Sequence, residues 1–389
     1  MWGARGTVSL QSDPVVRLLE DLVAIDSVNP ALVPGARGEA EIARRIAAEC
    51  TSIGLPVDIV EVAPGRPNVV GILEGKTPGP ALMLCGHLDT VGVAGMDAPF
   101  SPAYRDGRLY GRGAQDMKGG LAAMLGAARV VAEGGGLSRG ALIVAYVVDE
   151  EHASIGAEAL VERWRADAAV VTEPTDLDVA IAHKGFQWLE IETRGRAAHG
   201  SRPADGRDAI LRMGRVLTRL EAIDRQLQAQ RGHPLLGSPS LHASIIAGGT
   251  EWSSYPDRCI LHMERRTVPG ESADVGLQEA RAVLDRLRRE DWEFDGEARQ
   301  MFGRGAYEID PAHTLPATLM GAATSVGCTP QRVGMTFWSD AAILGAAGIP
   351  SVLFGPGGEG LHSPGEYVRV EDVRLCRDAL VALVREFVR

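Results

Sequence analysis

Apolar and polar positions follow two different patterns along this chain. In its first part, and again near its end, short apolar runs alternate with stretches whose apolar residues recur at helical spacing. Such runs predict buried strands. They lie at residues 68–73, 81–91, 141–148, 168–174 and 351–357. Strands that alternate with helices are typical of an α/β fold with a mostly parallel sheet.

Between about 183 and 300 the pattern changes. The segment "FQWLEIETRG" alternates like a half-exposed strand, and "DAILRMGRVLTRLEAID" has the periodicity of an amphipathic helix. Two further strands and a second helix follow, which gives the order β-α-β-β-α. This order predicts a smaller α+β domain with one sheet face covered by helices. We therefore expect a discontinuous catalytic domain at 12–182 and 301–389, interrupted by an inserted domain at 183–300.

Composition narrows the class of protein. The 389 residues are 45% hydrophobic, enough to bury a sizeable core, and 51 acidic against 40 basic residues give a net charge of −11. This charge argues against a nucleic-acid partner, and no apolar segment is long enough to predict a membrane span. The five cysteines are widely spaced without a CxxC pair, which is typical of free thiols in a reducing compartment. Because the first residues also lack the apolar region of a signal peptide, we expect a cytoplasmic protein.

Three consecutive carboxylates follow the apolar run 141–148: Asp149, Glu150 and Glu151. Acids at the end of a buried strand repel one another and lose hydration, which is costly unless a cation lies among them. The pattern therefore raises the question of which cation this chain holds there.

Other metal-ligand residue types lie near the ends of predicted strands. His87 and Asp89 are two positions apart, so in an extended chain they point the same way, and the carboxylate can hold the ring N–H of a metal-bound imidazole. Asp116 lies in a glycine-rich turn before a helix, and Glu173 and His362 follow predicted strands. Taken singly, each has an ordinary alternative: a hydrogen-bonded buried histidine for His87, a helix cap for Asp116, and loop residues for the last two.

The joint placement of these residues is more informative than each alone. Open α/β sheets bind ligands at the carboxyl ends of their strands. Nitrogen and oxygen ligands without a thiolate suit zinc, cobalt or manganese. Two divalent ions would be balanced by Asp116, Glu173, one glutamate of the pair and a hydroxide, which leaves the other glutamate for acid–base work. The residues at or just past such strand ends are His87, Glu150, Glu151, Glu173 and His362.

Seven motifs in order give the chain a resemblance that covers nearly its whole length. They are "LLEDLVAIDSVNP", "GHLDTV", "GRGAQDMKGG", "DEEHASIGAEAL", "TEPTD", "KGFQWLEIETRGRAAHGSRPADGRDAI" and "FGPGGEGLHSPGEYV". With them the sequence resembles the M20 metallohydrolases, a family that includes aminoacylase-1, carboxypeptidase G2, acetylornithine deacetylase and succinyl-diaminopimelate desuccinylase. The resemblance implies two co-catalytic divalent metal ions, usually zinc, with cobalt or manganese as alternatives.

Carried over position by position, the resemblance also implies the ligand set. Asp116 would bridge the two ions, His87 and Glu173 would complete one site, and Glu151 and His362 the other. It also implies that Glu150 is the general base and that Asp89 orients His87. In the backbone it implies a cis peptide bond between Asp116 and Met117.

The inserted domain resembles the lid, or dimerisation, domain of this family, and the resemblance implies that it contacts the substrate. His199 in "GRAAHGSRP" would polarise the reacting carbonyl, in this family often from the partner subunit, and Arg266 in "ERRTVPGES" would bind a substrate carboxylate. A cross-strand surface charge is the alternative for Arg266. Two expected substrate-binding positions depart from the family pattern: Ser253 stands where asparagine is frequent, and Trp338 follows Phe337 where small residues are usual. Core packing would also explain this aromatic pair.

The resemblance thus implies an enzyme that hydrolyses the amide bond of a small N-acyl amino acid and forms a homodimer through the inserted domain. A dipeptidase or glutamate-type carboxypeptidase is the alternative, because both kinds of substrate carry an amide beside a carboxylate. A catalytically inactive binding protein would lack a metal ligand or the base, whereas each of those positions is filled in this sequence.

Overall fold

The computed structural model describes residues 13–388, and within this range the chain forms two compact units. Unit 1 contains residues 13–181, Ile309–Val333 and residues 339–388, whereas unit 2 contains Ala182–Glu308 and Gly334–Trp338. Unit 2 extends past the expected boundary at 300, and it includes the segment with Trp338, which we had expected in the catalytic domain. The assignment of catalysis to unit 1 and of a lid or dimerisation role to unit 2 stays a prediction.

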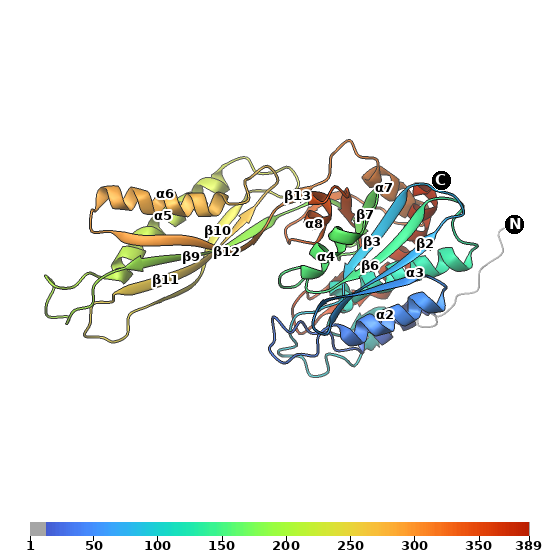
Figure 1. Ribbon diagram of the computed structural model, residues 1–389, viewed down its shortest axis with the longest axis horizontal. Helices are drawn as coiled ribbons and strands as arrows, with labels where there is room; N and C mark the ends of the chain where they lie inside the picture. Colours follow the sequence, from blue (N-terminus) through green and yellow to red (C-terminus); the bar gives the residue numbers. More distant parts are fainter. Residues whose placement is uncertain (1–12, 389) are drawn as a thin grey trace. The chain divides into compact units, whose positions relative to one another are not determined.

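The main sheet confirms the expected α/β fold with a mostly parallel centre. Its strands run in the order β1-β2-β6-β3-β7-β15-β8-β13, with β14 beside β8. Strand β3 pairs in parallel with β6 and β7, and β7 pairs in parallel with β15, whereas β1 and β2 are antiparallel. The bounds are β1 Val57–Ala63, β2 Arg66–Glu74, β3 Ala81–His87, β6 Ala141–Val147, β7 Ala168–Val171, β8 Val179–His183, β13 Tyr307–Glu308, β14 Arg332–Met335 and β15 Ser351–Leu353 (Figure 1).

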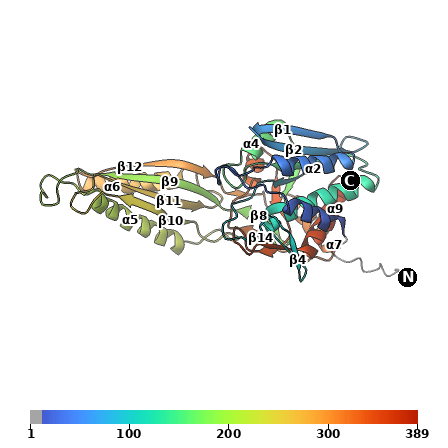
Figure 2. The same cartoon turned by 90° about the horizontal axis from the view of Figure 1, so that it is seen from below.

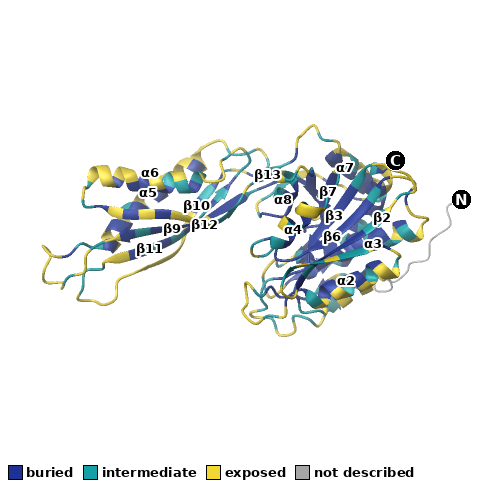
Figure 3. Ribbon diagram, viewed as in Figure 1, coloured by how far each residue is buried: buried dark blue, intermediate teal, exposed yellow. Residues whose placement is uncertain are grey.

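Burial explains why these strands were visible in the sequence. In β3 and β6 every residue after the first is buried, and nearly all of these residues are apolar. Continuous apolar runs are expected where helices cover both faces of a sheet. Figure 3 shows the same strands in the colour of buried residues.

Helices cover the sheet of unit 1. Helices α1, α3 and α9 contact one another, α7 packs on α9, α2 packs on β2, and α4 contacts α8. Their bounds are α1 Pro14–Val23, α2 Ala40–Ser52, α3 Gly119–Glu133, α4 Ile155–Arg163, α7 Leu315–Ser325, α8 Ala341–Ala346 and α9 Val370–Phe387. Among the described residues no helix has both the length and the apolar character that a membrane crossing requires.

Two smaller features of unit 1 frame the predicted ligands. Directly before α3, the turn η2 (Ala114–Lys118) contains the cis peptide bond Asp116–Met117, as the resemblance implied. A separate antiparallel sheet has the order β16-β17-β5-β4. Its strands are β4 Ala103–Arg105, β5 Arg108–Tyr110, β16 Gly358–Glu359 and β17 Tyr367–Arg369.

Unit 2 is an antiparallel sheet with the order β10-β11-β9-β12 and two helices. Alternate residues of β9, such as Leu189 and Ile191, pack with Met213 of α5 and Leu284 of α6 in one buried core. Figure 2 shows the four strands beside one another with both helices. The bounds are α5 Ala209–Ala229, α6 Val275–Glu290, β9 Gly185–Arg194, β10 Ser240–Gly248, β11 Arg258–Thr267 and β12 Asp295–Arg304.

Candidate metal centre

The carboxyl ends of three parallel strands bring the predicted acids and a histidine to one edge of the sheet. His87 is the last residue of β3, Glu150 and Glu151 follow the end of β6, and Glu173 follows the end of β7. Because these strands are parallel neighbours, their carboxyl ends meet at the same edge, where open α/β sheets place ligands.

A first group of potential metal ligands consists of His87, Asp116 and Glu173. One nitrogen or oxygen atom from each lies within 4.8 Å of the others. His87 Nε2 is 3.1 Å from Asp116 Oδ1 and 3.9 Å from Glu173 Oε1. All three side chains are largely shielded from solvent.

A second group shares Asp116 and adds Glu151 and His362. His362 Nε2 is 3.3 Å from Asp116 Oδ2 and 3.1 Å from Glu151 Oε2. The two oxygens of the Asp116 carboxylate therefore face different groups, Oδ1 towards His87 and Oδ2 towards His362. This is the arrangement that a carboxylate needs in order to bridge two ions.

Glu150 lies beside the first group without belonging to either. Its Oε2 is 4.0 Å from His87 Nε2, and its side chain is only 10% exposed. Burial, together with the negative charge of Glu173, raises the pKa of Glu150 well above its usual range. A carboxyl group with a raised pKa next to a ligand group is suited to accept and return a proton.

The donor set fits divalent metal ions. Burial raises the pKa of Glu173 well above its usual range, and burial together with the charge of Asp116 raises that of Glu151 to about 7. Oε1 of each of these two glutamates is buried without a hydrogen-bond partner among the described residues. A buried acceptor left unpaired costs about 1–3 kcal/mol, and a divalent cation in each ligand group would remove that cost.

The histidines respond to the same negative charge. Hydrogen bonds with Asp116 and Glu151 raise the pKa of His362 to about 10. Although burial opposes it, hydrogen bonds with His362 and His87 lower the pKa of Asp116.

The structure corrects the expected role of Asp89. His87 Nδ1 is 2.9 Å from the backbone oxygen of Asp89, whereas the Asp89 carboxylate is 3.6 Å away. That carboxylate instead accepts hydrogen bonds from the backbone amides of Glu150 and Glu151, each at 3.1 Å. Asp89 therefore contacts the His87 ring through its carbonyl oxygen, whereas its carboxylate binds the backbone amides of Glu150 and Glu151.

Sequence reasoning missed a buried residue that supports Asp116. Glu366 accepts hydrogen bonds at Oε1 from the amides of Gln115 and Asp116, at 2.9 and 3.1 Å, and at Oε2 from the amide of Gly113 at 3.0 Å. The signal in the sequence was an acid four positions after His362, but its burial becomes visible only in the fold.

The four residues for which the resemblance implied substrate contacts all lie in unit 2, where they form two pairs. His199 and Ser253 lie close together, because Gly200 donates its amide to the Ser253 carbonyl oxygen at 2.7 Å; both are exposed. Arg266 and Trp338 both contact the Phe186 ring, with the guanidinium carbon at 5.5 Å and the indole at 6.2 Å from its centroid. Trp338 is 9% exposed, which agrees with the core-packing alternative.

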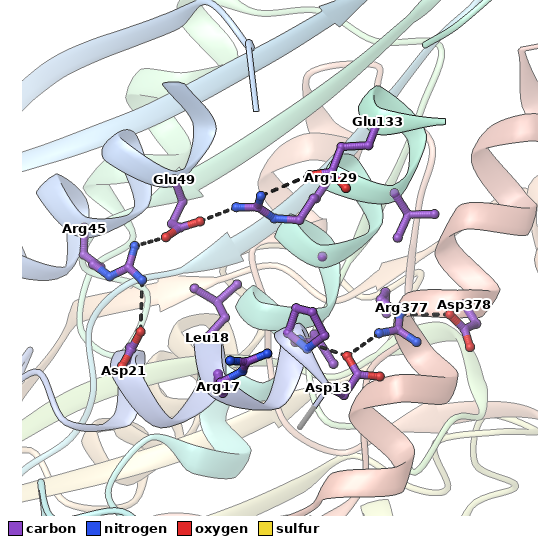
Figure 4. A pocket seen from close by; sticks show the side chains of 14 residues that line it. Asp13, Arg17, Leu18, Asp21, Arg45, Glu49, Arg129, Glu133, Arg377 and Asp378 are labelled. Carbon is purple, nitrogen blue, oxygen red and sulfur yellow. Dashed lines mark hydrogen bonds and ion pairs between the residues drawn. The ribbon is translucent and has the colours of Figure 1, made fainter. Parts of the chain in front are cut away.

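Unit 1 also contains a hollow of about 570 Å³ lined by residues of α1, α2, α3 and α9 (Figure 4). None of the candidate metal ligands lines it. Its charged side chains pair with one another: Arg45 with Asp21, Arg129 with Glu133, and Arg377 with Asp13. Because these charges are already paired, the hollow is a weaker candidate site than the strand edge.

Comparisons with known proteins agree with this geometry. A family model described as peptidase family M20/M25/M40 matches residues 83–386. An acetylornithine deacetylase of Myxococcus xanthus is 33% identical over 82% of this chain and 84% of its own, and an N-formyl-4-amino-5-aminomethyl-2-methylpyrimidine deformylase of Bacillus subtilis is 29% identical over 94% and 92%.

Solved structures show the same fold. A tripeptidase from Staphylococcus aureus has a TM-score of 0.81 and 22% identity, covering 99% of this chain and 100% of its own. A dinuclear metal-binding peptidase of Bacillus subtilis has a TM-score of 0.70 and 18% identity, covering 96% and 98%. The family match and the two ligand groups together identify this chain as a member of peptidase family M20/M25/M40 and as a metal-dependent hydrolase.

Proposed function

We propose that this chain hydrolyses the amide bond of a small N-acyl amino acid with two divalent metal ions, of which zinc is the first candidate and cobalt or manganese the alternatives. The observation that carries the proposal is the Asp116 carboxylate, whose two oxygens lie 3.1 Å from His87 and 3.3 Å from His362. A bridging carboxylate between two ligand groups suits a two-metal hydrolase. The resemblance to acetylornithine deacetylase supports an acylated amino acid as the substrate.

In this proposal five residues would hold the ions: Asp116 would be shared by both, His87 and Glu173 would bind one, and Glu151 and His362 would bind the other. Bound ions would lower the pKa of a water molecule and polarise the substrate carbonyl.

Glu150 carries the proton in this mechanism. Its Oε2 would accept a proton from the attacking water and later donate it to the leaving amine. Its raised pKa favours the first of these transfers, because it makes the carboxylate a stronger base, and Glu150 is available for both because it belongs to neither ligand group. Asp89 would hold the direction of Glu150 through the backbone amide that it binds at 3.1 Å.

Unit 2 would supply the substrate contacts. His199 would donate a hydrogen bond to the developing oxyanion, and the terminal nitrogens of Arg266 would bind the substrate carboxylate. Arg266 Nε already donates to Glu264 at 2.6 Å, which fixes the direction of the guanidinium. Ser253 would offer a polar contact, whereas the buried Trp338 would support the surface under Arg266 through the shared Phe186 ring.

A second copy of the chain is the proposed protein partner, held through unit 2. Strand β10 forms an edge of the unit 2 sheet, and its Ile245 and Ile246 are 62% and 52% exposed. Edge strands with exposed apolar side chains are suited to pairing with another chain. We also propose a cytoplasmic location, because all five cysteines are free thiols.

One observation favours a second candidate, a deacylase that acts on a planar aromatic amine. On the face of β9 opposite the unit 2 core, Phe186, Trp188 and Phe302 form an aromatic group with ring centroids 5.1 to 5.9 Å apart. Trp188 is 41% exposed, so a planar ring could stack there. The similarity to the pyrimidine deformylase supports testing such compounds beside the acylated amino acids.

The experiment that tests the function is hydrolysis of a substrate panel by metal-loaded protein, with a chelated control. The panel contains acetyl and succinyl amino acids, dipeptides, acyl glutamates and formylated aromatic amines. Preference for N-acyl amino acids supports the proposal, and preference for dipeptides favours the peptidase alternative. Absence of metal-dependent hydrolysis across the panel would refute the proposed function.

A further inference from the structure

Two residues at the start of β2, Arg66 and Asn68, reach the loop that follows β6. This loop carries Glu150 and Glu151. In the antiparallel pairing of β2 and β6, Val69 lies opposite Tyr146. Continuing that register places Arg66 opposite Asp149, the first acid after the strand.

Asn68 closes the two ends of this loop. Its side-chain oxygen accepts a hydrogen bond from the Val148 amide at 3.1 Å, and its side-chain nitrogen donates to the Gly156 carbonyl oxygen at 2.8 Å. The approach is so close that a Cβ at Gly156 would lie 2.4 Å from the Val148 backbone. One side chain thus fixes the distance across the loop.

Arg66 forms an ion pair with Asp149, the second residue of the 148–156 loop. Its Nη1 is 2.8 Å from Asp149 Oδ1, and its Nε donates to the Glu39 carboxylate at 2.9 Å. Arg66, Glu39 and Asp149 are 9%, 0% and 1% exposed. Asn29 links this cluster to the metal centre, because its side-chain nitrogen donates to Asp149 at 3.0 Å and to Asp89 at 2.8 Å.

The backbone of Asp149 has an unusual conformation that these contacts hold. Its φ is +71°, in the left-handed region that residues other than glycine rarely adopt. Its carbonyl oxygen accepts hydrogen bonds from the amides of Ala153 and Ser154, at 3.1 and 2.6 Å. The next two amides, of Glu150 and Glu151, both point to the Asp89 carboxylate. The turn therefore fixes the directions in which the two glutamates leave the backbone.

We propose that Arg66 and Asn68 are positioning residues that clamp the 148–156 loop, so that Glu151 meets His362 while Glu150 stays free for proton transfer. This inference deepens the proposed function and rests on it for the role of Glu150. The sequence alone did not explain Asp149. In this proposal Asp149 is the residue through which Arg66 holds the loop.

The test is the paired variant Arg66→Met with Glu39→Gln, which removes the Arg66 part of the clamp while it conserves the net charge of the cluster. We expect metal affinity, measured by competition with a chelator, to fall about 10- to 100-fold for one of two ions, as is typical when residues behind metal ligands are changed. At saturating metal, kcat should fall by a similar factor with KM nearly unchanged. Hydrogen exchange should rise in the 148–156 peptide and not in β3 or β7.

The matched control is Arg163→Met with Asp58→Asn, which removes another arginine–aspartate pair of unit 1, 3.2 Å apart and partly exposed. It should leave metal affinity, kcat and exchange of the loop unchanged. Asn68→Ser is the second clamp variant, used if the first does not fold, and it should show the same loop exchange. Arg66→Lys, which keeps the charge, should recover part of the metal affinity.

The outcomes separate the clamp from the proposed function. A folded clamp variant with wild-type metal affinity and wild-type loop exchange overturns the clamp, whatever the substrate. If the wild-type protein hydrolyses nothing in the panel, the proposed function fails, yet metal affinity and exchange still decide on the clamp. Equal loss of protection over all of unit 1 would indicate general destabilisation and also overturn it.

Discussion

Glu150 and Glu151 are neighbours in the chain, yet they have different surroundings. Glu151 Oε2 is 3.1 Å from His362 and belongs to a ligand group, whereas Glu150 Oε2 lies 4.0 Å from His87 and belongs to none. Adjacent residues leave the backbone in different directions, so one can bind metal while the other faces the reactants. Spacing alone did not distinguish the two, and the family resemblance supplied the assignment.

Replacing Glu150 by glutamine tests this division of roles. The amide keeps the size of the side chain but does not accept a proton, so we expect kcat to fall by about 10²- to 10⁴-fold with both metal ions retained. Metal content by atomic absorption and kcat on the best substrate of the panel are the measurements. Glu162→Gln, an exposed substitution on α4, is the control. Near-normal turnover of a fully metal-loaded Glu150→Gln would refute the base assignment.

His183 in unit 2 should make stability depend on pH. Burial lowers the pKa of its imidazole from 6.5 to about 4. As the pH falls below 6.5, the unfolded chain binds a proton that the folded chain does not, so the free energy of unfolding decreases until about pH 4. At pH 5 this loss is roughly 2 kcal/mol relative to pH 7.

His183→Asn keeps a donor for the Lys184 carbonyl oxygen, which His183 Nδ1 contacts at 3.0 Å, and removes the titrating ring. Urea unfolding followed by tryptophan fluorescence at pH 7 and pH 5 should therefore show a smaller loss of stability in this variant. His242→Asn, at an exposed histidine of the same unit, should behave like the wild type. An unchanged difference between the two pH values in His183→Asn would contradict the prediction.

Individual ligands were predictable where chemistry and strand ends coincided, as for His87 and Glu173. The residues that hold them were not, because their partners are distant in sequence. Asn29 reaches Asp149 across 120 positions, and Glu366 reaches Asp116 across 250. No local pattern records such pairs, and the change of partner at Asp89 likewise depended on atomic positions.

At the scale of elements, the sequence indicated those strands that are buried on both faces and are therefore continuously apolar. Strands β3 and β6 were predicted within a few residues because their interiors are continuous apolar runs. Strand β12 was missed, since its segment "DGEARQMFGR" has only two buried residues and few apolar ones. The end of unit 2 at Glu308 was also missed, because the pattern of apolar and polar residues does not change there.

The close approach of α3 to Thr172, the residue that follows β7, depends on a glycine. A Cβ at Gly120 would lie 2.1 Å from the carbonyl oxygen of Thr172, directly before Glu173. Gly120→Ala should therefore separate the helix from the strand end and destabilise the protein by about 1–3 kcal/mol. Gly214→Ala in α5, where nothing lies within 4 Å, should instead stabilise by about 0.5–1 kcal/mol. The melting temperatures of both variants test this prediction. Shifts of the same sign in the two variants would contradict the close approach of Gly120 to Thr172.

At the scale of the molecule, metal ions should stabilise the fold. Unit 1 brings the carboxylates of Asp116, Glu150, Glu151 and Glu173 close together, so bound cations would offset their mutual repulsion. Binding that occurs only in the folded state adds about 2.7 kcal/mol when free metal is 100-fold above its dissociation constant. We expect the melting temperature to fall after chelation and to return with added zinc. Glu173→Gln should shrink this recovery, and a melting temperature insensitive to metal would argue against the site.

The proposed dimer can be tested at two edge strands, β10 of unit 2 and β1 of unit 1. Ile245 on β10 of unit 2 is 62% exposed, and Ile59 on β1 of unit 1 is 56% exposed. A lysine on a pairing edge introduces a charge that opposes association, whereas a lysine on a free edge is harmless. If unit 2 forms the interface, Ile245→Lys should yield monomers in light scattering after size exclusion, and Ile59→Lys should remain dimeric. The reverse result would move the interface to unit 1, and a monomeric wild type would exclude a role for a partner's His199 in catalysis.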